Sequence, residues 1–324
     1  MRPQALLTAL TLLSAFAPTH SASVDEDFPQ GVKRVPLRTH SLATPYLDDS
    51  LHSRWYDYGG DAVIRTDKYI RLTADRASQT GYVSSRLPLT SPSFEIEFEF
   101  KISGKGNLYG DGMAMWITKE RDQMGPVFGG PDNFEGLGIF IDTYKNNRPG
   151  VTFPYVMAMV GDGKTRYSQE DDGKPNELAG CPARGLHNSQ HVTKGRLIYA
   201  KDNFMKLELQ YKEPNKWITC FKVEAPPLPT VAYLGFSAET GELSENHDLI
   251  SVDVSTLFLP STKEQTTGMG SSSSYVRSVR KEKKSGSWFW FFVKLGLIGG
   301  AAYVGYTRYV VYAKKKQQSS QGLF

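Results

Sequence analysis

Residues 94–100 read Phe94-Glu95-Ile96-Glu97-Phe98-Glu99-Phe100, a strict alternation of apolar and acidic side chains. Successive side chains of a β-strand point to opposite faces, so this period of two predicts a strand. Its Phe and Ile side chains would pack on a core, and Glu95, Glu97 and Glu99 would share a solvated face. We find no helix-period stretch of useful length around it, so the alternation indicates an antiparallel sheet with one wet face.

Short apolar stretches on both sides of this strand are separated by clusters of Gly, Pro, Asn and Asp, which favour turns. The further strands expected from them are residues 112–118, 137–144, 155–160, 195–199, 204–211, 217–223, 231–237 and 248–254. Many short strands with turn signals between them are typical of a two-sheet antiparallel β sandwich. The sequence therefore predicts an all-β fold, built as one domain over residues 24–260.

The net charge of +4 is unevenly distributed along the chain. Residues 277–324 hold ten Lys or Arg and one Glu, which leaves 28 basic and 33 acidic residues in the remainder, a balance of −5. The body of the protein is thus mildly acidic. This balance argues against nucleic acid as a partner, because the excess positive charge is confined to one end of the chain.

Both ends of the chain carry membrane-targeting signals. Residues 1–23 have the basic start, apolar centre and small-residue end of a cleavable signal peptide, with an uncleaved anchor as the alternative. Residues 288–312 are mostly apolar and begin and end with Trp and Tyr, which predicts one C-terminal transmembrane helix. Residues 261–287 would form a flexible stalk and residues 313–324 a cytosolic tail, in a type I arrangement. Gly296 and Gly300 are spaced for close helix approach, so a homo-oligomer is possible, although glycines are common in such helices.

The chain contains two cysteines, Cys181 and Cys220. In the oxidising lumen that a signal peptide implies, we expect them to form a disulfide with a stabilising role. Two free buried thiols are the alternative.

A turn rich in oxygen ligands follows the expected strand 137–144. The side chains of Asp142 and Asn146 and the carbonyl of Tyr144 could supply three oxygens to a hard cation such as Ca2+, and the acidic segment 170–172 could supply another. On spacing alone, the competing interpretation is a set of Asx turns that satisfy local backbone groups.

Asp111 lies between Gly110 and Gly112, which leave room for a ligand to approach its carboxylate. An ionised carboxylate accepts strong hydrogen bonds from the vicinal hydroxyls of a sugar, and Tyr144 could stack on the sugar's C–H face. A tight Gly-Asp-Gly turn is the alternative.

Six separated motifs decide between these alternatives by their likeness to a known family. They are residues 107–116, 125–129, 132–134, 138–146, 176–181 and 241–248. In this order they resemble the L-type (leguminous-type) lectin domain of secretory-pathway cargo receptors over roughly residues 30–260. The signal peptide, stalk, single helix and short tail are similar to the layout of the vesicular integral membrane protein branch.

The resemblance implies a concanavalin-like β sandwich (jelly roll) that binds high-mannose N-glycans with the help of Ca2+. It makes Asp142, Asn146, Asp172 and the Tyr144 carbonyl the calcium ligands. It assigns sugar contacts to residues at five places in the chain, namely Ser78; Asp111; Tyr144 and Asn146; Gln169; and the arm-selecting loop Gly241, Glu242 and Leu243. Gln169 stands where the family usually has a His, which puts acid-triggered sugar release in doubt, and Glu242 stands where Asp is commoner.

Other functional classes are less well supported. A concanavalin-like glycosidase needs two carboxylates across the scissile bond, but Glu95, Glu97 and Glu99 are better explained as a solvated face. A metal-independent adhesion ectodomain is the third possibility. We expect no metal role for the pair His187 and His191, and we expect His247 to form a structural hydrogen-bonded pair with Asp248.

The last residues, Leu323 and Phe324, resemble hydrophobic export signals read by vesicle coat proteins. Together these features predict a non-enzymatic cargo receptor for mannose-rich glycoproteins. It would be a single-pass membrane protein of the endoplasmic reticulum, the ER–Golgi intermediate compartment and the Golgi.

Overall fold

The computed structural model describes residues 31–259 and 306–309. The chain divides into two units, residues 1–264 and 265–324. The expected signal peptide, the stalk, Leu323 and Phe324 lie outside the described residues, as does all of the expected transmembrane segment except residues 306–309, which are helical. Within the described part of the chain, no helix combines the length and the apolar character needed to cross a bilayer.

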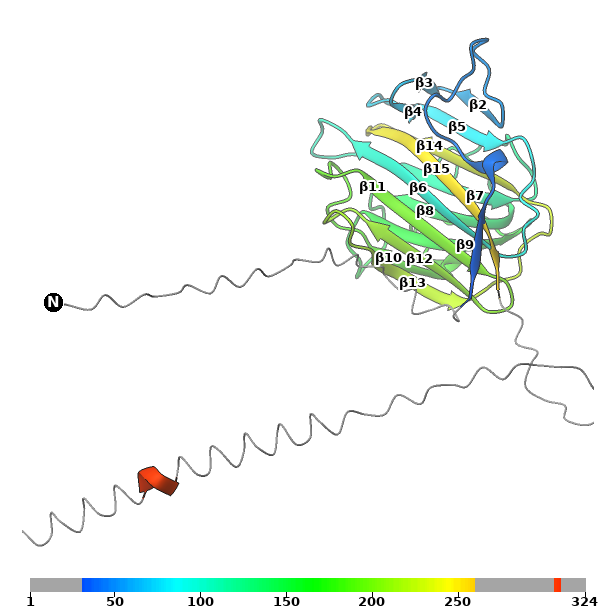
Figure 1. Ribbon diagram of the computed structural model, residues 1–324. Coiled ribbons are helices and arrows are strands. Elements are labelled where there is room, and N and C mark those ends of the chain that lie inside the picture. The colour runs from blue at the N-terminus through cyan, green and yellow to red at the C-terminus, as the bar shows by residue number, and fades with distance from the viewer. Residues whose placement is uncertain (1–30, 260–305, 310–324) are drawn as a thin grey trace, which may run out of the picture. The chain divides into compact units, whose positions relative to one another are not determined.

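Residues 31–259 form two stacked antiparallel sheets (Figure 1). The first sheet has the order β13 (Ile218–Glu224), β12 (Phe204–Gln210), β11 (Thr193–Ala200), β6 (Phe94–Ser103), β15 (Asn246–Phe258), β4 (Tyr69–Thr73) and β3 (Val63–Arg65), and β1 (Lys33–Pro36) pairs with β15. The second sheet has the order β10 (Ala179–Pro182), β9 (Tyr155–Asp162), β8 (Glu135–Asp142), β7 (Gly112–Thr118), β14 (Tyr233–Glu239), β5 (Thr80–Ser85) and β2 (Tyr56–Gly60). Two short 3-10 helices, Arg38–His40 and Lys174–Asn176, lie in the connections. The all-β sandwich expected from the alternation is confirmed.

The alternating stretch 94–100 forms most of β6, a strand at the centre of the first sheet. Its Phe and Ile side chains are fully buried in the core between the sheets. The acidic face is only partly exposed and is ion-paired: Glu99 lies 2.5 Å from Lys194 Nζ on the neighbouring β11, and Glu95 accepts hydrogen bonds from Arg34 Nε. The three glutamates thus belong to the outer face of the first sheet, where cross-strand charges balance them.

Several strands were not expected from the sequence, namely β1 to β5 and β10. They have three to six residues each, and β2 and β5 contain glycine, so they lack the long alternation that marks β6. Several expected boundaries were also wrong, and the one that matters for the site is the end of β8, which lies at Asp142 and leaves Thr143 and Tyr144 in the following turn. This difference places the oxygen-rich turn at the end of the sheet.

Cys181 and Cys220 form a disulfide, as expected. Cys181 lies in β10, the edge strand of the second sheet, and Cys220 lies in β13, the edge strand of the first. The bridge therefore links the two layers of the sandwich along one side.

A second apolar cluster covers the outer face of the second sheet. Side chains from β7, β8 and β9 pack there against aromatic residues of two long loops, including Phe128, Phe134 and Tyr167. Phe140 of β8 is at the centre, in edge-on contact with Trp116, Phe134 and Tyr167. These loops give the sandwich a partial third layer, and a cavity opens at its end.

Candidate functional site

Three strand ends of the second sheet meet in one row. Gly112, the first residue of β7, pairs with Asp142, the last residue of β8, and with Glu239, the last residue of β14. Residues directly opposite one another on antiparallel strands point to the same face. The loops that follow β8 and β14 and precede β7 therefore leave the sheet side by side, although they are far apart in the sequence.

The expected metal ligands are brought together at this end of the sheet. Asp172 comes from the loop after β9, and its carboxylate accepts hydrogen bonds from the Asn146 N–H at 3.0 and 3.1 Å and from Asn146 Nδ2 at 2.7 Å. Asp142 accepts a hydrogen bond from the Tyr144 N–H at 3.1 Å. Asp142 and Asp172 are only 5% and 2% exposed.

The charges of this cluster are suited to a cation. Burial, followed by the nearby negative charge of Asp172, raises the pKa of the Asp142 carboxyl well above its usual value. The buried Arg148 donates hydrogen bonds from its guanidinium to the Asp172 carbonyl and to the Glu177 carboxylate, and the same guanidinium lies over the Tyr155 ring. Two buried carboxylates, one amide and a turn carbonyl are the oxygen donors that Ca2+ prefers. The residues present therefore fit the ion that the family resemblance implies.

Within residues 31–259 and 306–309, no group of three or more His, Cys, Asp or Glu side chains is arranged to hold a metal ion. The oxygen cluster does not need such a group, because two of its four expected ligands are an amide and a backbone carbonyl. The histidine pair His187 and His191 belongs to no metal cluster either.

A cavity of about 270 Å³ lies beside this cluster. It is lined by Asp111, Pro126, Phe128, Asp142, Tyr144, Asn146, Tyr167, Gln169 and Glu239. Four of the expected sugar contacts, Asp111, Tyr144, Asn146 and Gln169, are thus around one space. Tyr144 and Asn146 are exposed, so a ligand can reach them from solvent.

Asp111 has a defined backbone position in this cavity. Its N–H donates to the Glu239 carbonyl at 3.1 Å, and its own carbonyl accepts from the Thr143 N–H at 3.0 Å. Burial raises the pKa of its carboxyl. Gln169, another residue of the lining, donates its amide N–H to the Pro126 carbonyl, which ties its side chain to the loop that carries Phe128.

The remaining expected sugar contacts lie next to the cavity without lining it. Gly241 is close to the Asp111 carboxylate, since a Cβ on Gly241 would be 3.0 Å from Asp111 Oδ2. The Ser78 N–H donates to the Gly241 carbonyl at 2.9 Å, and both Ser78 and Glu242 are exposed. A Cβ on Gly110 would meet Leu243 on one side and Tyr144 on the other. These residues form a rim next to Asp111.

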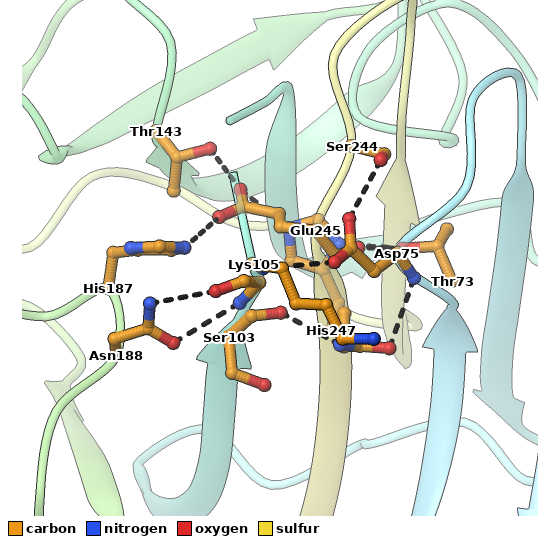
Figure 2. A network of polar contacts seen from close by, with 12 residues as sticks. Thr73, Asp75, Ser103, Lys105, Thr143, His187, Asn188, Ser244, Glu245 and His247 are labelled. Atoms are coloured by element: carbon orange, nitrogen blue, oxygen red, sulfur yellow. Dashed lines mark hydrogen bonds and ion pairs between the residues drawn. The ribbon is translucent and has the colours of Figure 1, made fainter. Parts of the chain in front are cut away.

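A buried polar network centred on Glu245 lies next to the turn that contains Thr143 (Figure 2). Glu245 is fully buried; its carboxylate accepts a hydrogen bond from the Thr143 hydroxyl and lies 3.2 Å from His247 Nε2. Its second oxygen lies 3.4 Å from His187 Nε2 without forming a hydrogen bond. The His187 ring stacks on Tyr109 with centroids 3.6 Å apart. Through Thr143 and Tyr109, this network contacts the turns that carry both candidate sites.

The expected pairing of His247 with Asp248 is wrong. The two residues are neighbours in β15, so their side chains point to opposite faces. His247 Nδ1 lies 2.7 Å from the Thr73 hydroxyl, whereas Asp248 accepts two hydrogen bonds from Arg71 at 2.7 and 2.9 Å.

The sequence reasoning missed Glu239, Pro126, Phe128 and Tyr167 as parts of the cavity. Tyr167 is buried, and its hydroxyl has no hydrogen-bond partner among the described residues. In the sequence, the segment 125–129 is recognisable only as a motif, and Glu239 ends a strand whose neighbours in the sheet depend on long-range pairing. None of the three glutamates of β6 lines the cavity.

Comparison with known proteins agrees with this geometry. The pattern of the legume-like lectin family matches residues 33–264. An L-type lectin-like domain-containing protein of Schizosaccharomyces pombe is 43% identical over 67% of this chain and 70% of its own length. Human vesicular integral-membrane protein VIP36 is 38% identical over 75% of this chain and 68% of its own length. This chain thus spans about two thirds of the length of these relatives.

A crystal structure of the exoplasmic/lumenal domain of VIP36 with Ca2+ and Man2 bound superposes with a TM-score of 0.66. It is 37% identical in sequence, and the match covers 70% of this chain and 92% of that domain. The two-sheet sandwich is therefore the legume-lectin fold. The matched pattern spans well over half of this chain, and the chain belongs to the legume-like lectin family.

Proposed function

We propose that this protein is a calcium-dependent lectin that binds high-mannose N-glycans. One observation carries the proposal: Asp142 and Asn146, the latter held by the buried Asp172, line the same cavity as Asp111 and Tyr144. The crystal structure of VIP36 with Ca2+ and Man2 bound supports the proposal.

In this proposal Asp142, Asp172, the Asn146 amide and the Tyr144 carbonyl hold Ca2+. The ion supplies positive charge that offsets the two buried carboxylates. The chain supplies the orientation: Asp172 positions both the backbone and the side chain of Asn146, so the same carboxylate that binds the cation also fixes a residue of the cavity lining.

Asp111 and Asn146 are then the groups that hold mannose hydroxyls. An ionised carboxylate accepts charge-assisted hydrogen bonds, and an amide both donates and accepts. The exposed ring of Tyr144 offers an apolar face to the C–H side of the sugar. The neighbouring parts of the glycan would contact Gln169 of the cavity lining and the rim residues Ser78, Gly241, Glu242 and Leu243.

We further propose that the protein acts as a cargo receptor for glycoproteins in the early secretory pathway, in the ER, the ER–Golgi intermediate compartment and the Golgi. The name of its relative VIP36, a vesicular integral-membrane protein, supports this location. Residues 288–312 would anchor the receptor, residues 24–260 would bind glycan, and Leu323 and Phe324 would contact vesicle coat proteins. A homo-oligomer would raise avidity where single-site affinity is low.

The test is binding of the full-length chain to a glycan array, first with Ca2+ and then with a chelator. We expect signals on mannose-rich glycans that the chelator removes. Replacement of Asn146 with Ala should abolish these signals and leave the fold and the Cys181–Cys220 disulfide intact. Mannose binding that resists the chelator would refute the calcium requirement. Folded natural protein that binds no mannose-rich glycan would refute the lectin function and favour a metal-independent adhesion module.

A further inference from the structure

Glu239 is a carboxylate of the cavity to which neither the sequence motifs nor the metal cluster assigns a role. It is the last residue of β14, where Leu234, Phe236 and Ala238 point into the core between the sheets. Side chains alternate along a strand, so Glu239 points away from that core, to the same outer face as the cavity. It lines the cavity together with Asp111.

The register of the sheet explains how Glu239 faces the site. Glu239 and Asp142 flank Gly112 in one row across three strands, at a distance of two strand spacings, or about 10 Å between backbones. A Cβ on Gly112 would lie 3.1 Å from the Phe128 ring, so the absence of a side chain there lets Phe128 approach the sheet between the two carboxylates. Glu239 and Asp142 thus line the same cavity from the two strands on either side of Gly112, together with Phe128.

The contacts of Glu239 leave it able to accept a ligand's hydrogen bond. Its Oε2 accepts the Gly129 N–H at 3.1 Å, and its Oε1 has no donor among the described residues. Burial is the main cause that raises the pKa of the Glu239 carboxyl. The hydrogen bond from Gly129 opposes this effect, and the negative charge of Asp111 adds to it. None of the described residues that line the cavity is basic. Glu239 is therefore a partly buried carboxylate that no cation of the cavity lining offsets.

We propose that Glu239 is a further sugar-contacting residue, which accepts a hydroxyl hydrogen bond beside Asp111 and selects neutral hexoses over anionic ones. This inference rests on the proposed mannose-binding function. A carboxylate accepts hydroxyl protons more strongly than an amide does, so it contributes to affinity. It also repels a phosphate carried on the same sugar, so it contributes to specificity.

The charge balance of the site indicates that Glu239 and Asp111 are the residues that would disfavour an anionic sugar. Bound Ca2+ would offset the two carboxylates of Asp142 and Asp172. Asp111 and Glu239 would remain as two uncompensated negative charges around the sugar. Removing either one halves the charge that an anionic sugar meets, but only Glu239 lies outside the family's expected sugar contacts.

The experiment measures binding of methyl α-mannoside and of methyl α-mannoside 6-phosphate to the full-length chain in saturating Ca2+. The variants are Glu239→Gln, which keeps shape and removes charge, and Glu239→Asp, which keeps charge. Glu224→Gln is the matched control, because Glu224 is an exposed residue at the end of β13, the edge strand of the first sheet, and does not line the cavity. The rise in melting temperature on adding Ca2+ verifies that each variant is folded, since the four calcium ligands are unchanged.

We expect Glu239→Gln to bind the mannoside about tenfold more weakly, as is typical for one lost hydrogen bond to a charged group. Its preference for the neutral over the phosphorylated sugar should fall by a similar factor. Glu239→Asp should retain that preference, and Glu224→Gln should behave like the natural chain. The inference is overturned if the natural chain binds mannoside and Glu239→Gln matches it in both affinity and preference. If the natural chain binds no mannoside at all, the proposed function fails with it.

Discussion

A single buried carboxylate, that of Asp172, accepts three hydrogen bonds from Asn146: two from its backbone N–H at 3.0 and 3.1 Å and one from its side-chain amide at 2.7 Å. The two residues are 26 positions apart in the chain. Asn146 lines the cavity, whereas Asp172 is buried behind it. Any change that loosens Asp172 should therefore affect the cavity as well as the metal cluster.

Replacing Asp172 with Asn should remove the stabilisation that Ca2+ gives the protein. For the natural chain, Ca2+ at a hundred times its dissociation constant should add about 2.7 kcal/mol, or roughly 5–10 °C in melting temperature for a domain of this size. Asp172→Asn should show little rise and no mannose binding. Thermal melts with and without Ca2+ measure this, and Glu170→Gln, at an exposed acidic residue two positions away, should keep the full rise. An undiminished rise in Asp172→Asn would exclude that carboxylate as a ligand.

Replacing Gln169 with His should introduce acid sensitivity into sugar binding. Gln169 is exposed, lines the cavity and does not titrate, so it cannot itself carry a charge switch. A histidine there, with an ordinary pKa near 6.5, would gain positive charge beside the calcium cluster as the pH falls from 7.5 to 5.5. We expect mannose affinity of Gln169→His to fall several-fold more across this range than that of the natural chain. Parallel affinity curves for the two proteins would contradict this role for position 169.

Loss of the disulfide should destabilise the sandwich without changing its site. The bridge closes a loop with a sequence separation of 39 and joins the edge strands of the two sheets. A chain-entropy estimate for such a loop is about 4 kcal/mol. Denaturant unfolding of the double variant Cys181→Ser, Cys220→Ser should show a loss of roughly this size, with mannose affinity retained. Reductant should weaken the natural chain in the same way and leave the double variant unaffected, and equal unfolding midpoints would contradict a stabilising bridge.

His187 should make the fold less stable in acid. Burial lowers the pKa of its imidazole, more than nearby Glu245 raises it, so the unfolded chain takes up a proton at higher pH than the folded chain does. The stability that results is fully present above the unfolded pKa of about 6.5 and is lost as the pH falls towards the folded pKa.

We therefore expect His187→Gln to show a shallower fall in unfolding free energy between pH 7.5 and 5 than the natural chain. His191→Gln is the matched control, because His191 is exposed. Its curve should keep the slope of the natural chain. The slope is the readout, since loss of the stack on Tyr109 lowers the stability of His187→Gln at every pH. Equal slopes for all three proteins would show that His187 does not cause the acid sensitivity.

Much of the fold could be predicted because its signals are local. The alternation of residues 94–100 reports the two faces of one strand, and β6 carries it as expected. The turn after β8 holds Asp142, Tyr144 and Asn146 within five residues, so their proximity follows from chain connectivity alone. The disulfide followed from there being only two cysteines.

The short strands β1 to β5 and β10 could not be predicted in this way. A strand of three to six residues shows too few alternations to be recognised, and it becomes a strand because neighbouring strands supply its hydrogen bonds. For the same reason, the pairing of His247 with Thr73, and of Asp248 with Arg71, depends on the register of β15 with β4.

Local sequence thus settled the class of fold, the oxygen-rich turn and the cysteine pair, because each depends on residues that are close in the chain or few in number. The tertiary structure alone decided which distant residues share the cavity. Glu239 and Asp142 line one cavity because both pair with Gly112 of the strand between theirs, and Asp172 holds Asn146 because two loops meet at one end of a sheet. These relationships arise from strand register, which long-range backbone hydrogen bonds and core packing set jointly and which no short stretch of sequence encodes.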